Sequence, residues 1–273
     1  VSELCKRLDP IVTAWNGRNL RDSRFPFVVV DALVLKVREE GRVRSRGVML
    51  AYGVNTDGYR EILGLMLGDS ESEASWSEFF SWLKSRDLRG VDVIVSDHHG
   101  GLVKAIRQHF QGVTWQRCQT HFVRNILDAT PKSLQEELYP RVRAILDAPD
   151  MDTARLLLHQ TLQSYETKAP KAMRILESGF DDATAVLMLP ERYRKRLRTT
   201  NGMERLNEEI RRRERVIRIF PNRESVVRLI GALLMEVDEK WASGKRYLDM
   251  AEYLDWKQRQ QEIKKASKVM PIR

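Results

Sequence analysis

The fold is decided by the stretch Phe25-Pro26-Phe27-Val28-Val29-Val30-Asp31-Ala32-Leu33-Val34-Leu35-Lys36-Val37. This stretch is rich in β-branched residues, and in its first half apolar residues occupy consecutive positions. A strand with that pattern has both of its faces covered, as in the centre of a sheet with helices on both sides. The sequence therefore predicts a buried central strand, with Asp31 directly after its most apolar part.

Four further strands are expected after the central one. Turn signals at residues 39–42 and 55–58 separate the first three strands, which predicts an antiparallel meander. Helical periodicity then alternates with two short strands, and the first of these ends at Asp97. The expected elements are strands at residues 47–54, 59–68, 91–97 and 113–116 and helices at residues 72–88 and 102–110. The predicted fold class is therefore α/β, with a mixed five-stranded sheet flanked by helices.

The pattern changes after Cys118. Between residues 121 and 190 apolar residues recur at helical spacing, and the segment is punctuated by Pro131, Pro149, Pro170 and Pro190. This pattern predicts an all-α insertion in the α/β core. The predicted domains are an N-terminal helix and connector at residues 1–24, the core at residues 25–120 and 196–242, the all-α insertion at residues 121–195, and a helical C-terminal tail at residues 243–273.

Composition and charge restrict the class of protein. The 273 residues are 42% hydrophobic and 31% charged, which is typical of a globular chain and not of a disordered one. Two cysteines are too few for a disulfide framework, which favours a reducing compartment, and no apolar run is long enough to span a membrane. The formal net charge of +9 favours a polyanionic partner such as nucleic acid.

Two acids follow apolar strands, and a third lies near the start of a helix. Asp31 and Asp97 fit a site for Mg²⁺, which prefers oxygen ligands. Glu204 is the best third carboxylate of a two-metal site, since Glu208 and Glu209 are explained as helix partners of nearby arginines. Each aspartate alone also fits a turn or helix cap, and this alternative stays open.

Positive charge is concentrated near Glu204. Residues 192–218 contain eleven Lys and Arg side chains and four acids, an excess of seven within the net +9 of the chain. Ten of the eleven are Arg, which suits bidentate contacts with phosphate. The alternative is a solvated helix face with internal salt bridges, but four acids cannot neutralise eleven cations. The predicted DNA-binding residues are Arg194, Lys195, Arg196, Arg198, Arg205, Arg211, Arg212, Arg213 and Arg215.

The segment Cys118-Gln119-Thr120-His121 has the spacing of a metal-binding pair. A zinc site needs about four ligands, and the chain offers no second pair of this kind. The sequence therefore disfavours zinc. A buried thiol and a hydrogen-bonded imidazole remain the simpler interpretation.

Taken together, these motifs resemble the Mutator-type family of bacterial insertion-sequence transposases. The resemblance covers residues 1 to about 255, and its Cys-x-x-His and Thr-Thr-Asn-x-x-Glu-Arg blocks, in this order, are quite specific. The resembling blocks are Val28-Val29-Val30-Asp31-Ala32, Val93-Ile94-Val95-Ser96-Asp97 with Gly101-Leu102, Arg117-Cys118-Gln119-Thr120-His121-Phe122-Val123-Arg124-Asn125, and Arg198-Thr199-Thr200-Asn201-Gly202-Met203-Glu204-Arg205-Leu206-Asn207.

The resemblance implies a ribonuclease-H-like catalytic core in which Asp31, Asp97 and Glu204 bind two Mg²⁺ or Mn²⁺ ions. It implies cleavage at the ends of a mobile element and strand transfer into target DNA. The expected partners are double-stranded DNA and further copies of the chain, in the bacterial cytoplasm at the nucleoid and not at a membrane. Cys118 and His121 belong to the family signature.

Relatives in this family usually carry an N-terminal region of helix-turn-helix character. Only its last helix would remain at residues 1–9, so we expect the chain to be truncated. Two alternatives from other classes stay open: a domesticated DNA-binding module without activity, and a ribonuclease-H-like nuclease that only hydrolyses DNA, such as a junction resolvase.

Overall fold

Side chains of strand β1 (Phe27–Glu39) alternate between two apolar layers, as its consecutive valines predict. Val28 and Val30 pack on one face of the sheet, and Phe27 and Val29 pack on the other. The computed structural model describes residues 3–269 and places β1 in the middle of five strands. The prediction of a central strand covered on both faces is confirmed.

The sheet has the strand order β3-β2-β1-β4-β5. β1 pairs antiparallel with β2 (Arg42–Val54), and β2 pairs antiparallel with β3 (Arg60–Gly68), which is the predicted meander. Glu40 and Gly41 form the first turn with φ angles of 49° and 76°, as a two-residue hairpin requires. On the other side, β1 pairs in parallel with β4 (Val93–Ser96), and β4 with β5 (Thr114–Arg117).

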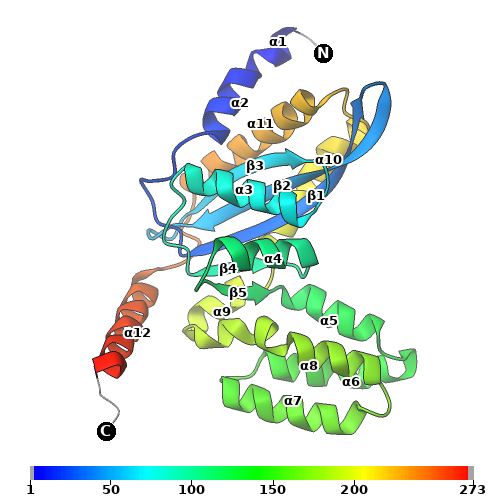
Figure 1. Ribbon diagram of the computed structural model, residues 1–273, viewed down its shortest axis with the longest axis vertical. Coiled ribbons are helices and arrows are strands. Elements are labelled where there is room, and N and C mark those ends of the chain that lie inside the picture. The colour runs from blue at the N-terminus through cyan, green and yellow to red at the C-terminus, as the bar shows by residue number, and fades with distance from the viewer. Residues whose placement is uncertain (1–2, 270–273) are drawn as a thin grey trace.

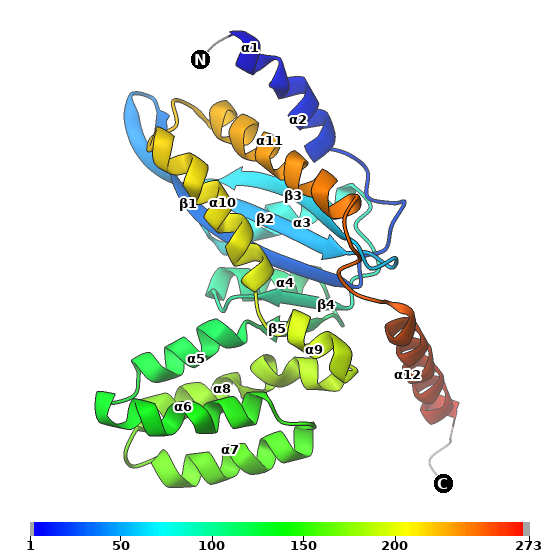
Figure 2. The ribbon, with the colours of Figure 1, turned by 180° about the vertical axis from the view of Figure 1, so that it is seen from behind.

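Helices cover both faces of this mixed sheet. α3 (Glu73–Ser85) and α4 (Gly100–His109) lie on one face (Figure 1), and α10 (Asn201–Ile217) and α11 (Arg223–Ala242) lie on the opposite face (Figure 2). Ser72 caps α3, because its side chain accepts a hydrogen bond from the backbone of Ser75. The predicted α/β class, with a mixed five-stranded sheet flanked by helices, is confirmed.

All elements described between residues 119 and 197 are helical, and they have a hydrophobic cluster of their own. They lie beyond β5, the edge strand of the sheet (Figure 1). Pro131 and Pro190 directly precede helices and Pro170 begins one, whereas Pro140 lies inside α6. The elements are α5 (Gln119–Asp128), α6 (Lys132–Leu146), α7 (Met151–Tyr165), α8 (Pro170–Thr184), the 3-10 helix η1 (Ala185–Met188) and α9 (Glu191–Leu197).

The described ends of the chain are helical as well. α1 (Glu3–Lys6) and α2 (Leu8–Asn16) lie next to α11, whereas α12 (Ala251–Val269) extends away from the sheet (Figures 1 and 2). Tyr253 anchors the start of α12, because its ring is buried and its hydroxyl donates a 2.8 Å hydrogen bond to Asp92. Within residues 3–269, none of the helices combines the length and the apolar character that crossing a membrane requires.

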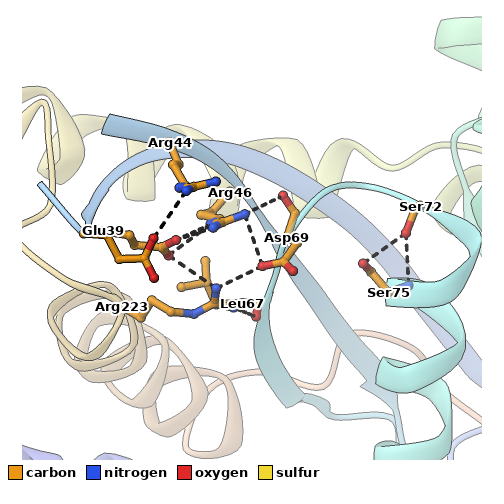
Figure 3. Close-up of polar contacts among 9 residues, drawn as sticks. Glu39, Arg44, Arg46, Leu67, Asp69, Ser72, Ser75 and Arg223 are labelled. Carbon is orange, nitrogen blue, oxygen red and sulfur yellow. Dashed lines mark hydrogen bonds and ion pairs between the residues drawn. The ribbon is translucent and has the colours of Figure 1, made fainter. Parts of the chain in front are cut away.

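A polar network stabilises the part of the β1–β2 hairpin that lies near its turn (Figure 3). Arg46 donates to the carboxylate of Glu39 and lies 3.1 Å from Asp69. Arg223 of α11 lies 3.3 Å from the same Glu39 and 3.0 Å from the same Asp69. Two arginines and two acids therefore connect β1, β2, α11 and the end of β3. Because the two acids balance the two positive charges, Arg46 is already paired within the protein.

Candidate active site

Asp31 lies inside β1, two residues beyond Val29, where the pairing of β1 with β4 ends. The prediction that a strand ends before Asp31 is wrong, because β1 continues beside β2 as far as Glu39. Side chains alternate along a strand, so Asp31 shares the face of Phe27 and Val29, which α10 covers. Its carboxylate accepts hydrogen bonds of 2.8 Å from the backbone of Ala32 and 2.7 Å from the side chain of Asn207.

Asp97 directly follows β4, where the sequence placed it. His121 of α5 meets this acid, with its Nδ1 atom 2.5 Å from Oδ1 of Asp97. The other ring nitrogen of His121 lies 3.8 Å from a carboxylate oxygen of Glu204. One imidazole therefore lies between two of the three predicted acids.

A buried thiol places His121 and Glu204 beside each other. The backbone N–H and the hydroxyl of Thr200 lie 3.4 Å and 3.3 Å from Sγ of Cys118 and donate to it. Cys118 precedes α5 and Thr200 precedes α10, so these contacts join the starts of both helices. His121 and Glu204 each follow about one turn later. Thr200 occupies the N-cap position of α10, but its side chain makes no capping hydrogen bond, because its hydroxyl binds the thiol instead.

The acids are close enough to oppose ionisation. Burial raises the pKa of Asp31 to about 7, together with the negative charge of Asp97 and, to a smaller extent, of Glu71. The hydrogen bonds from Ala32 and Asn207 act in the opposite direction but do not cancel this effect. A carboxylate that is disfavoured by neighbouring carboxylates gains stability when a cation binds between them.

His121 supplies positive charge at the same place. Its contacts with Asp97 and Cys118 raise the pKa of the imidazole to about 10, although burial lowers it. Burial alone raises the pKa of the Cys118 thiol, but hydrogen bonds from His121 and Thr200 outweigh burial and lower it. At neutral pH His121 is therefore an imidazolium that partly offsets the charge of the acids.

Two sets of candidate metal donors include Asp97, but among the described residues only one of these sets has ligand atoms that all lie within 4.8 Å of one another. Asp31, Asp97 and Glu204 offer the oxygen ligands that suit Mg²⁺ or Mn²⁺. Asp97, Cys118 and His121 form a second set, whose ligand atoms all lie within 4.8 Å of one another. The hydrogen bonds of Cys118 with Thr200 and the ion pair of His121 with Asp97 account for this second set without a metal.

Six of the nine predicted DNA-binding cations line one of two pockets. Arg211, Arg212 and Arg215 line a pocket of about 710 Å³ that Glu204 and Asn207 also line. Lys195, Arg196 and Arg205 line another pocket, at a different face of α10. Four of the predicted cations form hydrogen bonds or ion pairs within the protein. Arg194 donates to Pro149 and Leu189, Arg198 pairs with Asp147, Arg211 donates to Val34 and pairs with Glu214, and Arg212 pairs with Glu209.

Several residues of the site were missed in the sequence. Asn207 is three residues after Glu204 on the same helix, and that spacing places the two side chains on one face. The same spacing after His121 could have identified Arg124, which lines the 710 Å³ pocket. Arg60 lies in the second cationic pocket, and no local pattern connects it to α10.

The chain matches known proteins over nearly its whole length. Residues 1–244 match the sequence profile described as "Transposase, Mutator family". The chain is 42% identical, over 91% of its length, to the transposase for insertion sequence element IS256 in transposon Tn4001 of Staphylococcus aureus. It is 40% identical, over 92% of its length, to the transposases for ISRM5 of Rhizobium meliloti and IS1081 of Mycobacterium tuberculosis.

These matches cover 64%, 63% and 60% of the three relatives, so the chain spans less than two thirds of their length. The family profile nevertheless covers far more than half of this chain and includes Asp31, Asp97, Cys118, His121 and Glu204. The chain belongs to the Mutator family of transposases.

Proposed function

We propose that this chain is the catalytic part of a DNA transposase, which cuts strands at the ends of an insertion element and joins them to target DNA. The observation that carries the proposal is the meeting of Asp97, His121 and Glu204 beside a cationic pocket, in a chain whose relatives are named transposases. The activity, DNA substrates and oligomeric assembly of the complete protein are all part of this proposal.

The proposed core is ribonuclease-H-like, at residues 25–120 and 196–242. Three antiparallel strands followed by two parallel ones, with Asp31 on the central strand and Asp97 after its parallel neighbour, support this assignment. The helices between β5 and α10 support an all-α insertion at residues 121–195. The remaining proposed domains are the N-terminal helix and connector at 1–24 and the C-terminal tail at 243–273.

Asp31, Asp97 and Glu204 would hold two divalent ions of the Mg²⁺ or Mn²⁺ type, which supply Lewis-acid polarisation of the reacting phosphate when bound. The raised pKa of Asp31 fits this role, because burial and the negative charge of Asp97 both disfavour a carboxylate that a bound cation would stabilise. Asn207 and Ala32 hold the Asp31 carboxylate in one orientation through both of its oxygens. His121 holds Asp97 and borders Glu204, which fixes the second and third acids relative to each other.

The proposed reaction is phosphoryl transfer without a covalent protein intermediate. In cleavage the oxygen of water forms a bond to phosphorus and loses its proton, and the bond to the leaving 3′-oxygen breaks. In strand transfer the freed 3′-hydroxyl attacks a phosphate of the target strand in the same way. Arginines of α10 would bind phosphates on both sides of this point, and such contacts position DNA without reading its sequence. We place this reaction on DNA of the bacterial nucleoid, in a homo-oligomer.

A strand-transfer assay with pre-cut DNA ends that carry a free 3′-hydroxyl tests the proposal. Joining of these ends to a target duplex in Mg²⁺ is the expected result. Cleavage without joining would instead identify a hydrolytic nuclease, and binding without either reaction would identify a DNA-binding module.

Two isosteric variants connect this activity to the acids. Asp31→Asn and Asp97→Asn should lower cleavage and joining by about a thousandfold or more, because losing a metal ligand removes several kcal/mol of transition-state stabilisation. DNA binding should persist, since phosphate neutralisation supplies it. Asp152→Asn is the matched control, because the Asp152 side chain is 98% exposed on α7. Near-normal turnover of either site variant in Mg²⁺ would refute the assignment.

A further inference from the structure

A second cationic pocket, of about 450 Å³, lies at the start of α10. Its walls come from β3, α9, α10, the end of α11 and the segment after α11. The residues that matter here are Arg60, Lys195, Arg196, Arg205, Trp241 and Tyr247, and we call this site the Arg60 pocket. Arg205 and Glu204 are neighbours in sequence but line different pockets, so the Arg60 pocket and the candidate active site lie on different faces of the same helix.

Aromatic rings hold the central cation of this pocket. The guanidinium carbon of Arg60 lies 4.0 Å from the ring centre of Trp241 and 4.6 Å from that of Tyr247. Arg196 approaches the same Tyr247 ring at 5.0 Å. Such contacts orient a guanidinium while leaving its N–H groups available to an acceptor in the plane of the group.

The cations of the Arg60 pocket are not neutralised by the protein. Across the described part of the chain, the side chains of Arg60, Lys195, Arg196 and Arg205 form no ion pair and no hydrogen bond. Glu209 also lines the pocket, but it pairs with Arg212 at 2.9 Å. Burial lowers the pKa of Arg60, and the positive charges of Arg196 and Arg205 act in the same direction.

Other arginines of the same segment behave differently. Arg192 pairs with Asp249, Arg194 donates to backbone carbonyls, and Arg198 pairs with Asp147. The chain therefore provides protein partners for the cations outside the pocket. Four cations gathered without such partners repel one another, and an anion that enters between them removes this repulsion.

We propose that the Arg60 pocket binds a phosphate group of the DNA strand that the active site processes. Arginine and lysine donors match phosphate oxygens, and the apolar wall of Leu206 and Val237 leaves space for the attached sugar. Glu209 lines both this pocket and the pocket that contains Glu204, so the two pockets are neighbours on α10. The inference rests on the proposed function in taking DNA as the source of the phosphate.

The phosphate could be an internal phosphodiester or a terminal 5′-phosphate, and one binding experiment distinguishes them. Fluorescence anisotropy of a labelled random duplex, with either 5′-hydroxyl or 5′-phosphate ends, is measured in EDTA at several salt concentrations. Arg60→Ala should weaken binding and flatten the slope of log K against log[salt] by about 1, because one phosphate contact is lost. If Arg60→Ala binds both duplexes more weakly than wild type, the pocket holds an internal phosphate. If only its binding of the 5′-phosphorylated duplex is weaker, the pocket holds the terminal phosphate.

Two further variants keep the test decisive if Arg60→Ala folds poorly. Lys195→Ala removes an exposed cation of the same pocket and should flatten the slope by a similar amount. Arg155→Ala removes an exposed arginine of α7, outside both pockets, and should leave the slope unchanged. Slopes of the Arg60 and Lys195 variants equal to that of wild type would overturn the proposal and leave DNA binding elsewhere intact.

A measurement of thermal stability without DNA tests the Arg60 pocket independently of the proposed function. Inorganic pyrophosphate should raise the Tm of wild type and of Arg155→Ala more than that of Lys195→Ala. If pyrophosphate binds in this way but no duplex binds, the Arg60 pocket is an anion site, but its ligand is not a phosphate of DNA. The proposed function would then be wrong as well. If neither ligand binds, both proposals are wrong.

Discussion

Asn207 donates a 2.7 Å hydrogen bond to Asp31, although 176 positions separate the two residues. The contact joins α10 to the central strand at the point where the strand carries its only acid before Glu39. Asn207 is an amide and not a further acid, so it fixes the carboxylate without adding negative charge to a place where Asp97 already raises the pKa of Asp31.

Replacing Asn207 should therefore impair catalysis more than binding. Asn207→Ala removes a hydrogen bond to a carboxylate, worth about 1.5–3 kcal/mol, and should lower the cleavage rate about tenfold to a hundredfold. The acid limb of the pH–rate profile should move to higher pH, since the lost bond lowers the pKa of Asp31. Cleavage of a labelled element-end duplex at several pH values measures both effects.

Asn19→Ala is the matched control for this variant. It also removes an Asn side chain that bonds to a carboxylate, the 3.0 Å contact with Asp87, but at an exposed position outside the candidate site. Its cleavage rate and pH profile should equal those of wild type. An Asn207→Ala enzyme with the same profile as this control would show that Asn207 does not position Asp31.

The pKa of Asp31 also predicts how stability depends on pH. Because its pKa rises from the ordinary 3.8 to about 7 on folding, the folded chain binds more protons than the unfolded chain between these values. Stability should therefore fall as pH rises from about 4 to about 7, by up to about 4 kcal/mol in the absence of metal.

Asp31→Asn cannot ionise and should not show this loss. In EDTA the variant should be more stable than wild type at pH 8, and the difference should shrink towards pH 5. Chemical unfolding at several pH values measures the effect, and Mg²⁺ should reduce it by stabilising the ionised wild type. A wild-type stability that rises between pH 5 and pH 8 relative to the variant would contradict the raised pKa.

The contact between Thr200 and Cys118 yields a third prediction. Thr200→Val keeps the shape of the buried side chain but removes the hydroxyl that donates to the thiol, which should cost about 1–2 kcal/mol of stability. Because this contact joins the starts of α5 and α10, cleavage should fall as well, while DNA affinity stays unchanged.

Thr200→Ser keeps the donor and loses only a methyl group. It should retain most of the cleavage activity even if it loses comparable stability. Cleavage at a temperature well below the Tm of both variants is the measurement. Equal activity of the valine and serine variants would mean that the hydroxyl does not help to place Glu204 beside His121.

Much of the fold follows from local sequence. Consecutive valines at 28–30 require cover on both faces of the strand, and the turn at Glu40 and Gly41 requires an antiparallel neighbour. The prolines at 131, 170 and 190 coincide with the starts of helices, where proline is tolerated, whereas α6 accommodates Pro140 in its interior. These are constraints between residues a few positions apart.

The candidate site was only partly predictable, because it depends on distant pairs. Asp31 was expected at a strand end, but the meander with β2 carries β1 beyond the point where β4 stops. The hydroxyl of Thr200 could serve a helix cap or a distant thiol, and only the packing of α5 against α10 decides between them. Arg60 enters its pocket through contacts with Trp241 and Tyr247, which lie more than 180 positions later.

A comparison of two triple variants should decide which face of α10 contributes more to DNA binding. The first set is Arg211, Arg212 and Arg213. Arg211 and Arg212 line the pocket that contains Glu204, but Arg211 already donates to Val34 and Glu214, and Arg212 pairs with Glu209. Among residues 3–269, the side chains of Lys195, Arg196 and Arg205 form no ion pair and no hydrogen bond, and Arg196 lies against the ring of Tyr247. Replacing the second set with alanine should flatten the slope of log K against log[salt] by about 3, since each lost phosphate contact contributes about 0.9.

Replacing Arg211, Arg212 and Arg213 with alanine should flatten the slope by only about 1, because two of these arginines are engaged within the protein. Both triple variants remove the same charge, so a difference between them reflects phosphate contact and not net charge. Affinity should fall equally for unrelated duplex sequences, because phosphate contacts carry no base information. Titration of wild type and both variants onto one random duplex at several salt concentrations gives the three slopes. The opposite result, in which replacing Arg211, Arg212 and Arg213 flattens the slope more, would mean that DNA passes mainly along the Glu204 face of α10. The ion pairs of Arg211 with Glu214 and of Arg212 with Glu209 would then be exchanged for contacts with phosphate, which the small free energy of exposed ion pairs permits.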